Sequence, residues 1–267
     1  MERTQDEVVV KAIHALVREY PRYGYRRIHR KLRKQGFEHN KKVTYRLWRK
    51  EGFKVPRKRK KRRSKGKSVN AQHISPSTHV NDAWAWDYVH DVDTSGRTIR
   101  WLVLTDEYTR ELLILEPRRS FPARAAQASL LSVIAERGLP KRLRSDNGSE
   151  FTEDDLQTML GKSDIESCCI DPGKPWQNGK AESLNSRLRD EFFEMHEFNS
   201  LRDAKPLADQ FKHAYNHERE HSALGYQTPA EFAATVGCPV VVASLLPPAS
   251  QPCTMQPNPS SFTPELS

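Results

Sequence analysis

Apolar residues recur at helical spacing in three short series before residue 56. These series are Val9, Ile13, Leu16 and Tyr20; Ile28 and Leu32; and Val43 and Leu47. Pro21, Gly36 and Gly52 end the three series in turn, and Asn40 is a candidate N-cap for the third. The pattern predicts a small bundle of three helices.

From about residue 80 the apolar period changes to that of strands. Tryptophan and tyrosine alternate with other residues over the segment 84–89, and four more strand-like segments follow at 98–105, 111–116, 142–145 and 165–170. Helices are expected at 122–137, 153–160, 176–193, 201–215 and 229–235. Three consecutive strands followed by alternating helices and strands predict an α/β fold, a mixed sheet with helices on its faces.

The formal net charge of +10 is unevenly distributed along the 267 residues. Residues 1–56 hold 16 Lys/Arg against 6 Asp/Glu, and residues 57–67 hold 9 Lys/Arg and no acid. The other 200 residues therefore carry a net charge of −9. A basic amino-terminal arm on an acidic body predicts phosphate binding by the arm, with nucleic acid as the expected polyanion.

Two of the three amino-terminal helices present basic side chains on one face. These are Arg26, Arg30 and Arg33 in the second helix, and Lys42, Arg46 and Arg49 in the third. Two consecutive helices of this kind favour a helix-turn-helix-like contact with DNA over an ordinary solvated surface. The seven basic residues at 57–63 repel one another and predict a linker, which is also suited to following DNA phosphates.

Several classes of protein are disfavoured by the composition. The cysteines show neither a CxxC pair nor regular spacing, so reduced thiols are expected rather than zinc ligands or disulfides; they are Cys168, Cys169, Cys238 and Cys253. No stretch approaches the roughly 18 apolar residues of a membrane span, and the charged start lacks a signal-peptide pattern. We therefore expect a cytoplasmic protein with no membrane partner, and a disordered tail beyond Gly237.

Three carboxylates carry the candidate chemistry. Asp87 lies within a predicted strand, Asp146 directly follows another, and Glu182 lies beside the apolar seam of the helix expected at 176–193. Carboxylates brought close together repel one another unless cations lie between them. Mg²⁺ prefers oxygen ligands, and two such ions activate an attacking oxygen and stabilise the leaving one at phosphorus. We therefore expect two Mg²⁺ or Mn²⁺ ions bound by these three side chains.

Several motifs resemble those of the bacterial insertion-sequence transposases of the third family, whose catalytic core is similar to retroviral integrases. The matching segments are Trp86-Asp87, 145–151, 172–183 and a carboxy-terminal signature between Tyr215 and Phe232. The interval of 35 residues between Asp146 and Glu182 also matches. Glu220 stands where a proline is usual, and we expect this departure to alter a local turn rather than catalysis.

The resemblance covers about residues 10–235 and implies a ribonuclease-H-like core, a five-stranded mixed sheet flanked by helices, behind a small all-α domain. The expected divisions are a helical DNA-binding domain at 1–56, a basic linker at 57–79, the catalytic core at 80–195, a helical extension at 196–236 and a tail at 237–267. The implied activity is metal-dependent cleavage at the ends of a mobile element, followed by attack of the freed 3′-hydroxyl on a second DNA. Asp87, Asp146 and Glu182 are the implied catalytic ligands.

The implied partners are double-stranded DNA at element ends and target, further copies of the chain on that DNA, and the product of an upstream reading frame. The resemblance places such a protein at the bacterial nucleoid. Lys174 and Lys180 are expected to contact phosphate, while Asn185 and Arg189 share the helical face of Glu182 and either hold the DNA end or form plain surface. A catalytically silent DNA-binding regulator is the alternative function, and a purely hydrolytic nuclease is a third.

Other acids near the motifs have structural interpretations. Asp91 has the strand parity of Asp87, and Asp93 lies close by. We expect Asp106 to form an ion pair with Arg110, and Glu150 to cap a helix or lie on the surface.

Overall fold

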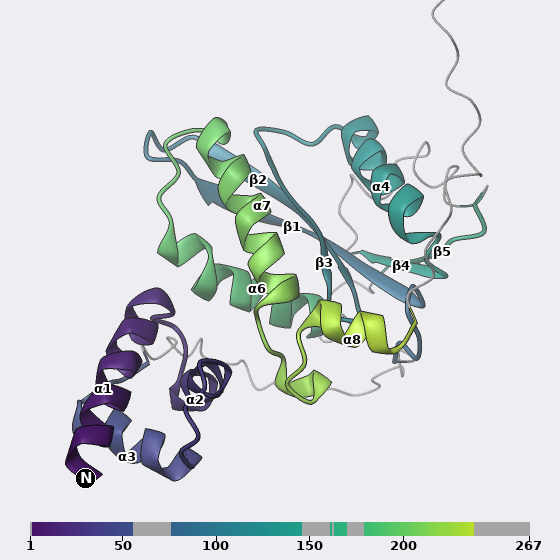
Figure 1. Ribbon diagram of the computed structural model, residues 1–267. Coiled ribbons are helices and arrows are strands. Elements are labelled where there is room, and N and C mark those ends of the chain that lie inside the picture. The colour runs from purple at the N-terminus through teal and green to yellow at the C-terminus, as the bar shows by residue number, and fades with distance from the viewer. Residues whose placement is uncertain (1, 56–75, 146–160, 162, 170–178, 238–267) are drawn as a thin grey trace, which may run out of the picture.

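The computed structural model describes residues 2–55, 76–145, 161, 163–169 and 179–237. Residues 2–55 form a bundle of three helices, here called the head, and the described residues from 76 to 237 form the body (Figure 1). The helices of the head are α1 (Glu2–Glu19), α2 (Tyr25–Lys34) and α3 (Lys41–Lys50). They bury one apolar cluster that includes Val9, Ile13, Leu16, Ile28, Leu32, Leu47 and Trp48. The predicted three-helix pattern is therefore confirmed.

Helix α3 begins where the sequence predicts, because the Asn40 side chain accepts a hydrogen bond of 2.9 Å from the Lys42 N–H. Its buried seam differs from the prediction. Val43 is half-buried, and Thr44 and Trp48 fill the seam beside Leu47. Thr44 can be fully buried because its hydroxyl is hydrogen-bonded to the imidazoles of His29 and His39. A pattern of apolar residues does not reveal such hydrogen bonds.

The body is built on a five-stranded mixed sheet in the order β3-β2-β1-β4-β5. Its strands are β1 (Ala83–Val92), β2 (Thr98–Asp106), β3 (Leu112–Arg118), β4 (Arg142–Ser145) and β5 (Glu166–Cys169). The first three form an antiparallel meander, while β4 is parallel to β1 and β5 is parallel to β4. The predicted mixed sheet with flanking helices is confirmed.

Helices cover both faces of this sheet (Figure 1). They are α4 (Ala123–Arg137), α6 (Gly179–Glu191), α7 (Leu201–His217) and α8 (Pro229–Thr235), with 3-10 turns η3 (Phe193–Met195) and η4 (Ser222–Leu224). Since successive side chains of a strand point to opposite faces, β1 contributes to two cores. Trp84 and Trp86 pack with Leu130 of α4, whereas Val89 packs in the second core with Leu184 of α6.

Helix ends follow local sequence signals. Gly138 has a φ of +87° and ends α4, a backbone conformation that favours glycine. Thr228 and Glu231 form a reciprocal capping box at the start of α8. The helix expected at 153–160 lies outside the described residues, as does the start of the one expected from residue 176.

The expected ion pair between Asp106 and Arg110 is wrong. The Asp106 carboxylate instead accepts backbone hydrogen bonds from Asn81, Tyr108 and Thr109, at 2.9, 2.7 and 3.0 Å. The turn after β2 directs these N–H groups at the buried side chain, so its oxygens are satisfied without a cation. Burial raises the pKa of Asp106. Among the described residues, no helix is long and apolar enough to cross a membrane.

Candidate active site

Asp87 lies in the middle of β1, on the sheet face that α6 and α7 cover. It shares this face with Val89, and the position opposite it in β2 is Val103. The carboxylate is half-buried, and its Oδ1 accepts a hydrogen bond of 2.7 Å from the N–H of Tyr88. The strand therefore presents the Asp87 carboxylate to the helical layer beside apolar neighbours.

Helix α6 brings a polar side chain to this carboxylate. Asn185 Nδ2 donates a hydrogen bond to Asp87 Oδ2, and the Asn185 Oδ1 is buried with no hydrogen-bond partner among the described residues. The rotation of α6 is set by the buried Leu184 and Leu188, which pack in the same core as Val89. Glu182 is exposed and precedes Asn185 by three residues, so both lie on the same side of the helix.

The third predicted acid, Asp146, lies outside the described residues, together with Glu150 and Lys174. The strand before it ends at Ser145, which is buried, and runs parallel to β1 with Arg144 aligned to Ala85. Within the described part of the chain, no group of three or more His, Cys, Asp or Glu side chains is arranged to hold a metal ion. Lys180 is the second residue of α6, and its side chain is not described.

The neighbouring acids of β1 have local partners. Asp91 accepts a hydrogen bond of 2.9 Å from the N–H of Val92, as Asp87 does from its own neighbour. Asp93 is buried in the turn after β1, where Ser95 and Arg119 hydrogen-bond to it. The Ser95 hydroxyl and the Arg119 guanidinium hold the pKa of Asp93 well below its usual range, although burial opposes them. Asp93 is therefore a turn-holding residue.

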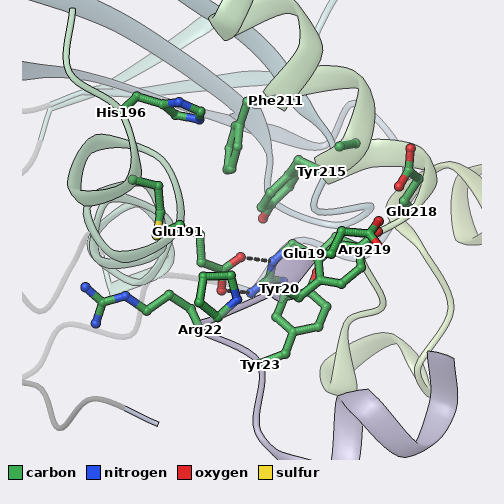
Figure 2. A pocket seen from close by; sticks show the side chains of 13 residues that line it. Glu19, Tyr20, Arg22, Tyr23, Glu191, His196, Phe211, Tyr215, Glu218 and Arg219 are labelled. Atoms are coloured by element: carbon green, nitrogen blue, oxygen red, sulfur yellow. Dashed lines mark hydrogen bonds and ion pairs between the residues drawn. The ribbon is translucent and has the colours of Figure 1, made fainter. Parts of the chain in front are cut away.

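The carboxy-terminal signature attaches its own segment to the rest of the body. Arg219 is buried and donates hydrogen bonds of 2.5 and 2.7 Å to the Glu191 carboxylate at the end of α6 (Figure 2). Its remaining nitrogen, Nη1, lies 2.9 Å from His221 Nε2. The Asn216 side chain exchanges two hydrogen bonds with the backbone of Leu112 in β3. These contacts fix α6 and β3 relative to α7.

Two titrating groups of this cluster are shifted by their surroundings. Burial raises the pKa of Glu191, but the hydrogen bond and charge of Arg219, with the charge of Arg27, outweigh it and hold the pKa below its ordinary value. Burial, and then the charge of Arg219, lower the pKa of His221 to about 2. The imidazole is therefore neutral, and the arginine donates to it.

The basic residues expected to contact DNA are in three different situations. Four of those in the head are exposed: Arg26, Arg33, Lys42 and Arg49. Arg46 is hydrogen-bonded to Asp6, at 3.0 and 2.8 Å, and Arg30 forms an ion pair with Glu220 of the body. On α6, Arg189 is exposed, whereas Asn185 contacts Asp87 rather than facing solvent.

Sequence reasoning missed two parts of this arrangement. The contact of Asn185 with Asp87 joins residues 98 positions apart, and no local pattern signals it. The ion pair of Arg219 with Glu191 likewise joins two distant charges. The only available signal was the place of Arg219 within the carboxy-terminal signature.

The chain matches two family descriptions that read "Integrase core domain", over residues 77–175 and 163–229, and one that reads "HTH-like domain", over residues 3–61. It is 33% identical over 230 residues to an uncharacterized 31.7 kDa protein of insertion element IS407 from Burkholderia multivorans, covering 86% of this chain and 82% of that protein. It is 28% identical over 248 residues to the transposase InsD of insertion element IS2 from Escherichia coli, covering 88% and 81% of the two chains.

A solved structure is similar across most of the chain. It is the intasome of simian T-cell lymphotropic virus in complex with PP2A regulatory subunit B56 gamma. The match has a TM-score of 0.54 at 16% sequence identity and covers 93% of this chain and 80% of that one. At this identity the likeness concerns the fold, which is that of an integrase core.

Proposed function

This chain belongs to the insertion-sequence transposases that carry an integrase core domain, and from that premise we propose that it cuts the ends of a mobile element and joins them to target DNA. Its class is that of enzymes that transfer polynucleotides, and its fold is ribonuclease-H-like. In the proposed reaction a water molecule first releases a 3′-hydroxyl at the element end. That hydroxyl then attacks a phosphodiester of the target in line, and the target's own 3′-oxygen leaves.

The contact of Asn185 with Asp87 is the observation that supports this proposal most directly. It brings the helix of Glu182 to the strand of Asp87, so two acids widely separated in sequence belong to one region of the molecule. Ser145, the last described residue of β4, lies in the strand next to β1, and Asp146 follows it in sequence. We propose that Asp87, Asp146 and Glu182 act together there.

The donor set fits a hard divalent cation. Carboxylate oxygens are preferred by Mg²⁺ and Mn²⁺, and Asn185 holds one oxygen of Asp87 while its own buried Oδ1 is left to accept a further hydrogen bond. Two such ions, when bound, supply charge stabilisation to both the attacking and the leaving oxygen. The protein's part is to hold the carboxylates charged, oriented and at fixed spacing.

DNA binding is proposed for the head and the linker. The exposed cations of α2 and α3 offer phosphate contacts. The proposed divisions are a DNA-binding domain at 1–56, a basic linker at 57–79 and a catalytic core at 80–195. Residues 196–236 are the proposed helical extension and 237–267 the proposed tail. Joining two ends of one element needs more than one active site, so we also propose a homo-oligomer on DNA, assisted by an upstream-frame product.

The test is replacement of one proposed ligand by its amide. Glu182 is exposed and contributes little to packing, so Glu182→Gln is expected to keep the fold and DNA binding. Cleavage and strand transfer are expected to disappear together, because one carboxylate oxygen is lost from an ion that demands near-ideal oxygen geometry. Both reactions are measured on a labelled element end with Mg²⁺. Glu150→Gln is the matched control and is expected to retain activity.

Two results would contradict the assignment. If Glu182→Gln joined element ends at the parental rate, another acid would have to supply the third ligand, and Glu150 would be tested first. If the parental protein bound the ends but neither cut nor joined them with Mg²⁺ or Mn²⁺, the silent regulator would be the better description.

A further inference from the structure

Four ion pairs join the head to the body. Arg22 pairs with Glu194, Arg27 with Glu191 at 3.2 Å, and both Arg30 and Lys34 with Glu220, the latter at 3.3 Å. Every cation comes from α2 or the turn before it, and every anion comes from η3, the end of α6 or the segment after α7. The guanidinium of Arg30 also lies over the ring of Tyr226, 4.6 Å from its centroid. In all four ion pairs the head supplies the cation and the body supplies the anion.

The basic side chains of α2 divide between two neighbouring sides of the helix. Arg27, Arg30 and Lys34 follow one another at offsets of three and four and face the body. Arg26 and Arg33 lie on the adjoining side and are exposed. Arg30 is thus at the border between the side bound to the body and the side open to DNA.

Among the described residues, the apolar core of the head is separate from the apolar cores of the body. The apolar cluster of the head and the two clusters of the body share no residue. Between head and body lies a cavity of about 240 Å³, lined on one side by Tyr20 and Tyr23 and on the other by Phe211 and Tyr215 (Figure 2). An interface with an open centre and charged pairs around it resembles a transient contact more than a shared core.

These ion pairs can be exchanged for contacts with another anion. The cations of these pairs, Arg27, Arg30 and Lys34, are 30%, 41% and 50% exposed, whereas the carboxylates of Glu191 and Glu220 are 14% and 9% exposed. Solvent reaches the cation side of each pair and weakens it, so the contribution to stability is smaller than that of a fully buried pair. A DNA phosphate offers the same charge and acceptor geometry as a carboxylate, and a guanidinium engaged bidentately by one is not available to the other. Arg219 still pairs with Glu191 after Arg27 has moved to a phosphate, so the buried Glu191 carboxylate keeps a cation.

We propose that Glu191, Glu194 and Glu220 form an acidic docking surface for the basic side of α2, and that DNA phosphates compete with this surface for the same cations. The head is docked in the free protein and released onto DNA. Glu220 has the largest part, because it binds two cations. The competition rests on the proposed DNA binding by the head, whereas the docking does not.

Docking is tested without DNA by small-angle X-ray scattering of the full chain at low salt. The variant Glu220→Lys places a third cation beside Arg30 and Lys34. The three cations repel one another, so the head is expected to leave the body and the radius of gyration to increase. Glu136→Lys makes the same charge change at an exposed position on α4, away from the head (Figure 1), and is expected to leave the radius unchanged. The double variant Glu220→Lys/Arg30→Glu restores an ion pair and is expected to recover the parental radius. A parental radius in Glu220→Lys would overturn the docking.

Competition is tested by titrating the full chain with duplex DNA at fixed salt. Glu220→Gln is expected to bind DNA about three- to tenfold more tightly than the control Glu136→Gln. This scale is that of exchanging partly exposed ion pairs. Equal affinities would overturn the competition. The double variant Arg26→Gln/Lys42→Gln tests the proposed DNA binding separately. If its DNA affinity equalled that of the parent, the proposal that this side of the head binds DNA would be wrong. The scattering experiment would still decide whether the head docks.

Discussion

Asn185 links the proposed active site to the helix that carries Glu182. Its Nδ2 holds one oxygen of Asp87, and its buried Oδ1 is positioned to take a further hydrogen bond. Asn185→Leu keeps the volume and removes both groups. We expect Mn²⁺ affinity to fall about 10- to 100-fold, as is typical when the partner of a metal ligand is lost.

The Mn²⁺ affinity is measured on the full chain by electron paramagnetic resonance, which does not depend on turnover. The control is Asn199→Leu, at an exposed asparagine whose only described side-chain contact is with Thr94. An unchanged affinity in Asn185→Leu would mean that this asparagine only packs. Loss of binding in Asp87→Asn but not in Asp91→Asn would independently identify the metal-binding acid of β1.

His221 gives the stability of the body a pH dependence. Its pKa is lowered to about 2 in the folded chain, so below its ordinary value of 6.5 the unfolded chain binds the extra proton. The stability it contributes is complete above pH 6.5 and is lost as the pH falls below that value. The expected loss is at most about 1.4 kcal/mol per pH unit.

Urea unfolding of the full chain at pH 7.5, 6.0 and 5.0 measures this loss. His221→Gln keeps an acceptor for Arg219 without a titrating group and is expected to flatten the profile over this range. His213→Gln, at an exposed histidine on α7, is the control and is expected to keep the parental profile. Identical profiles in the parent and in His221→Gln would exclude this origin.

Single residues were predictable where local context alone decides their place. The alternation of β1 places Asp87 on the opposite face from Trp86, and Asn40 caps α3 as its residue type indicates. The roles of Asn185 and Glu220 were not predictable, because each depends on a partner far along the chain. Long polar side chains on a helix surface satisfy many different contacts, so their type and spacing do not select one.

At the scale of elements, Asn216 attaches α7 to the edge of the sheet. Strand β3 is at the end of the strand order, so its outer backbone groups have no neighbouring strand within the described part of the chain. The Asn216 amide accepts from the N–H of Leu112 at 2.8 Å and donates to its carbonyl at 3.0 Å. Asn216→Ala leaves both groups unsatisfied and is expected to lower the free energy of unfolding by about 1–3 kcal/mol.

Chemical denaturation measures this change. Gln210→Ala, at an exposed position on the same helix, is the control and is expected to stay within about 0.5 kcal/mol of the parent. A loss no larger in Asn216→Ala than in Gln210→Ala would show that water replaces the asparagine at the sheet edge.

The elements with the sharpest end signals matched best. The expected strand at 142–145 coincides with β4, which Pro140 precedes. The expected helix at 229–235 coincides with α8, whose start is marked by the capping box of Thr228 and Glu231. The seam of α3 was misplaced because burial of Thr44 depends on two histidine partners outside that helix. Periodicity records apolar side chains, and it misses a polar residue whose hydrogen bonds make burial acceptable.

At the scale of the whole molecule, charge is divided between a basic head with its linker and an acidic body. The sequence predicted this division and assigned the cations to DNA. It did not predict that some of them lie against acids of the body, as Arg30 does against Glu220. Net charge specifies the sign of a partner, whereas the identity of the nearest anion depends on how the two parts pack.

The basic run at 57–63 lies outside the described residues, and its charge alone supports a prediction about the whole chain. Each phosphate that a cation neutralises releases counterions, so the logarithm of DNA affinity falls with the logarithm of salt concentration by about 0.9 per contact. If this run follows the DNA backbone, Arg62→Gln/Arg63→Gln is expected to flatten the slope by up to about two units.

The slope is measured on the full chain with one duplex between 50 and 200 mM salt, the range over which phosphate contacts weaken steeply. Arg202→Gln/Lys205→Gln removes the same charge from exposed positions on α7 and separates phosphate contact from a change in net charge. Its slope is expected to equal that of the parent, because long-range attraction without contact releases few counterions. Equal slopes in all three proteins would mean that Arg62 and Arg63 contact no phosphate and that this part of the run acts only as a spacer.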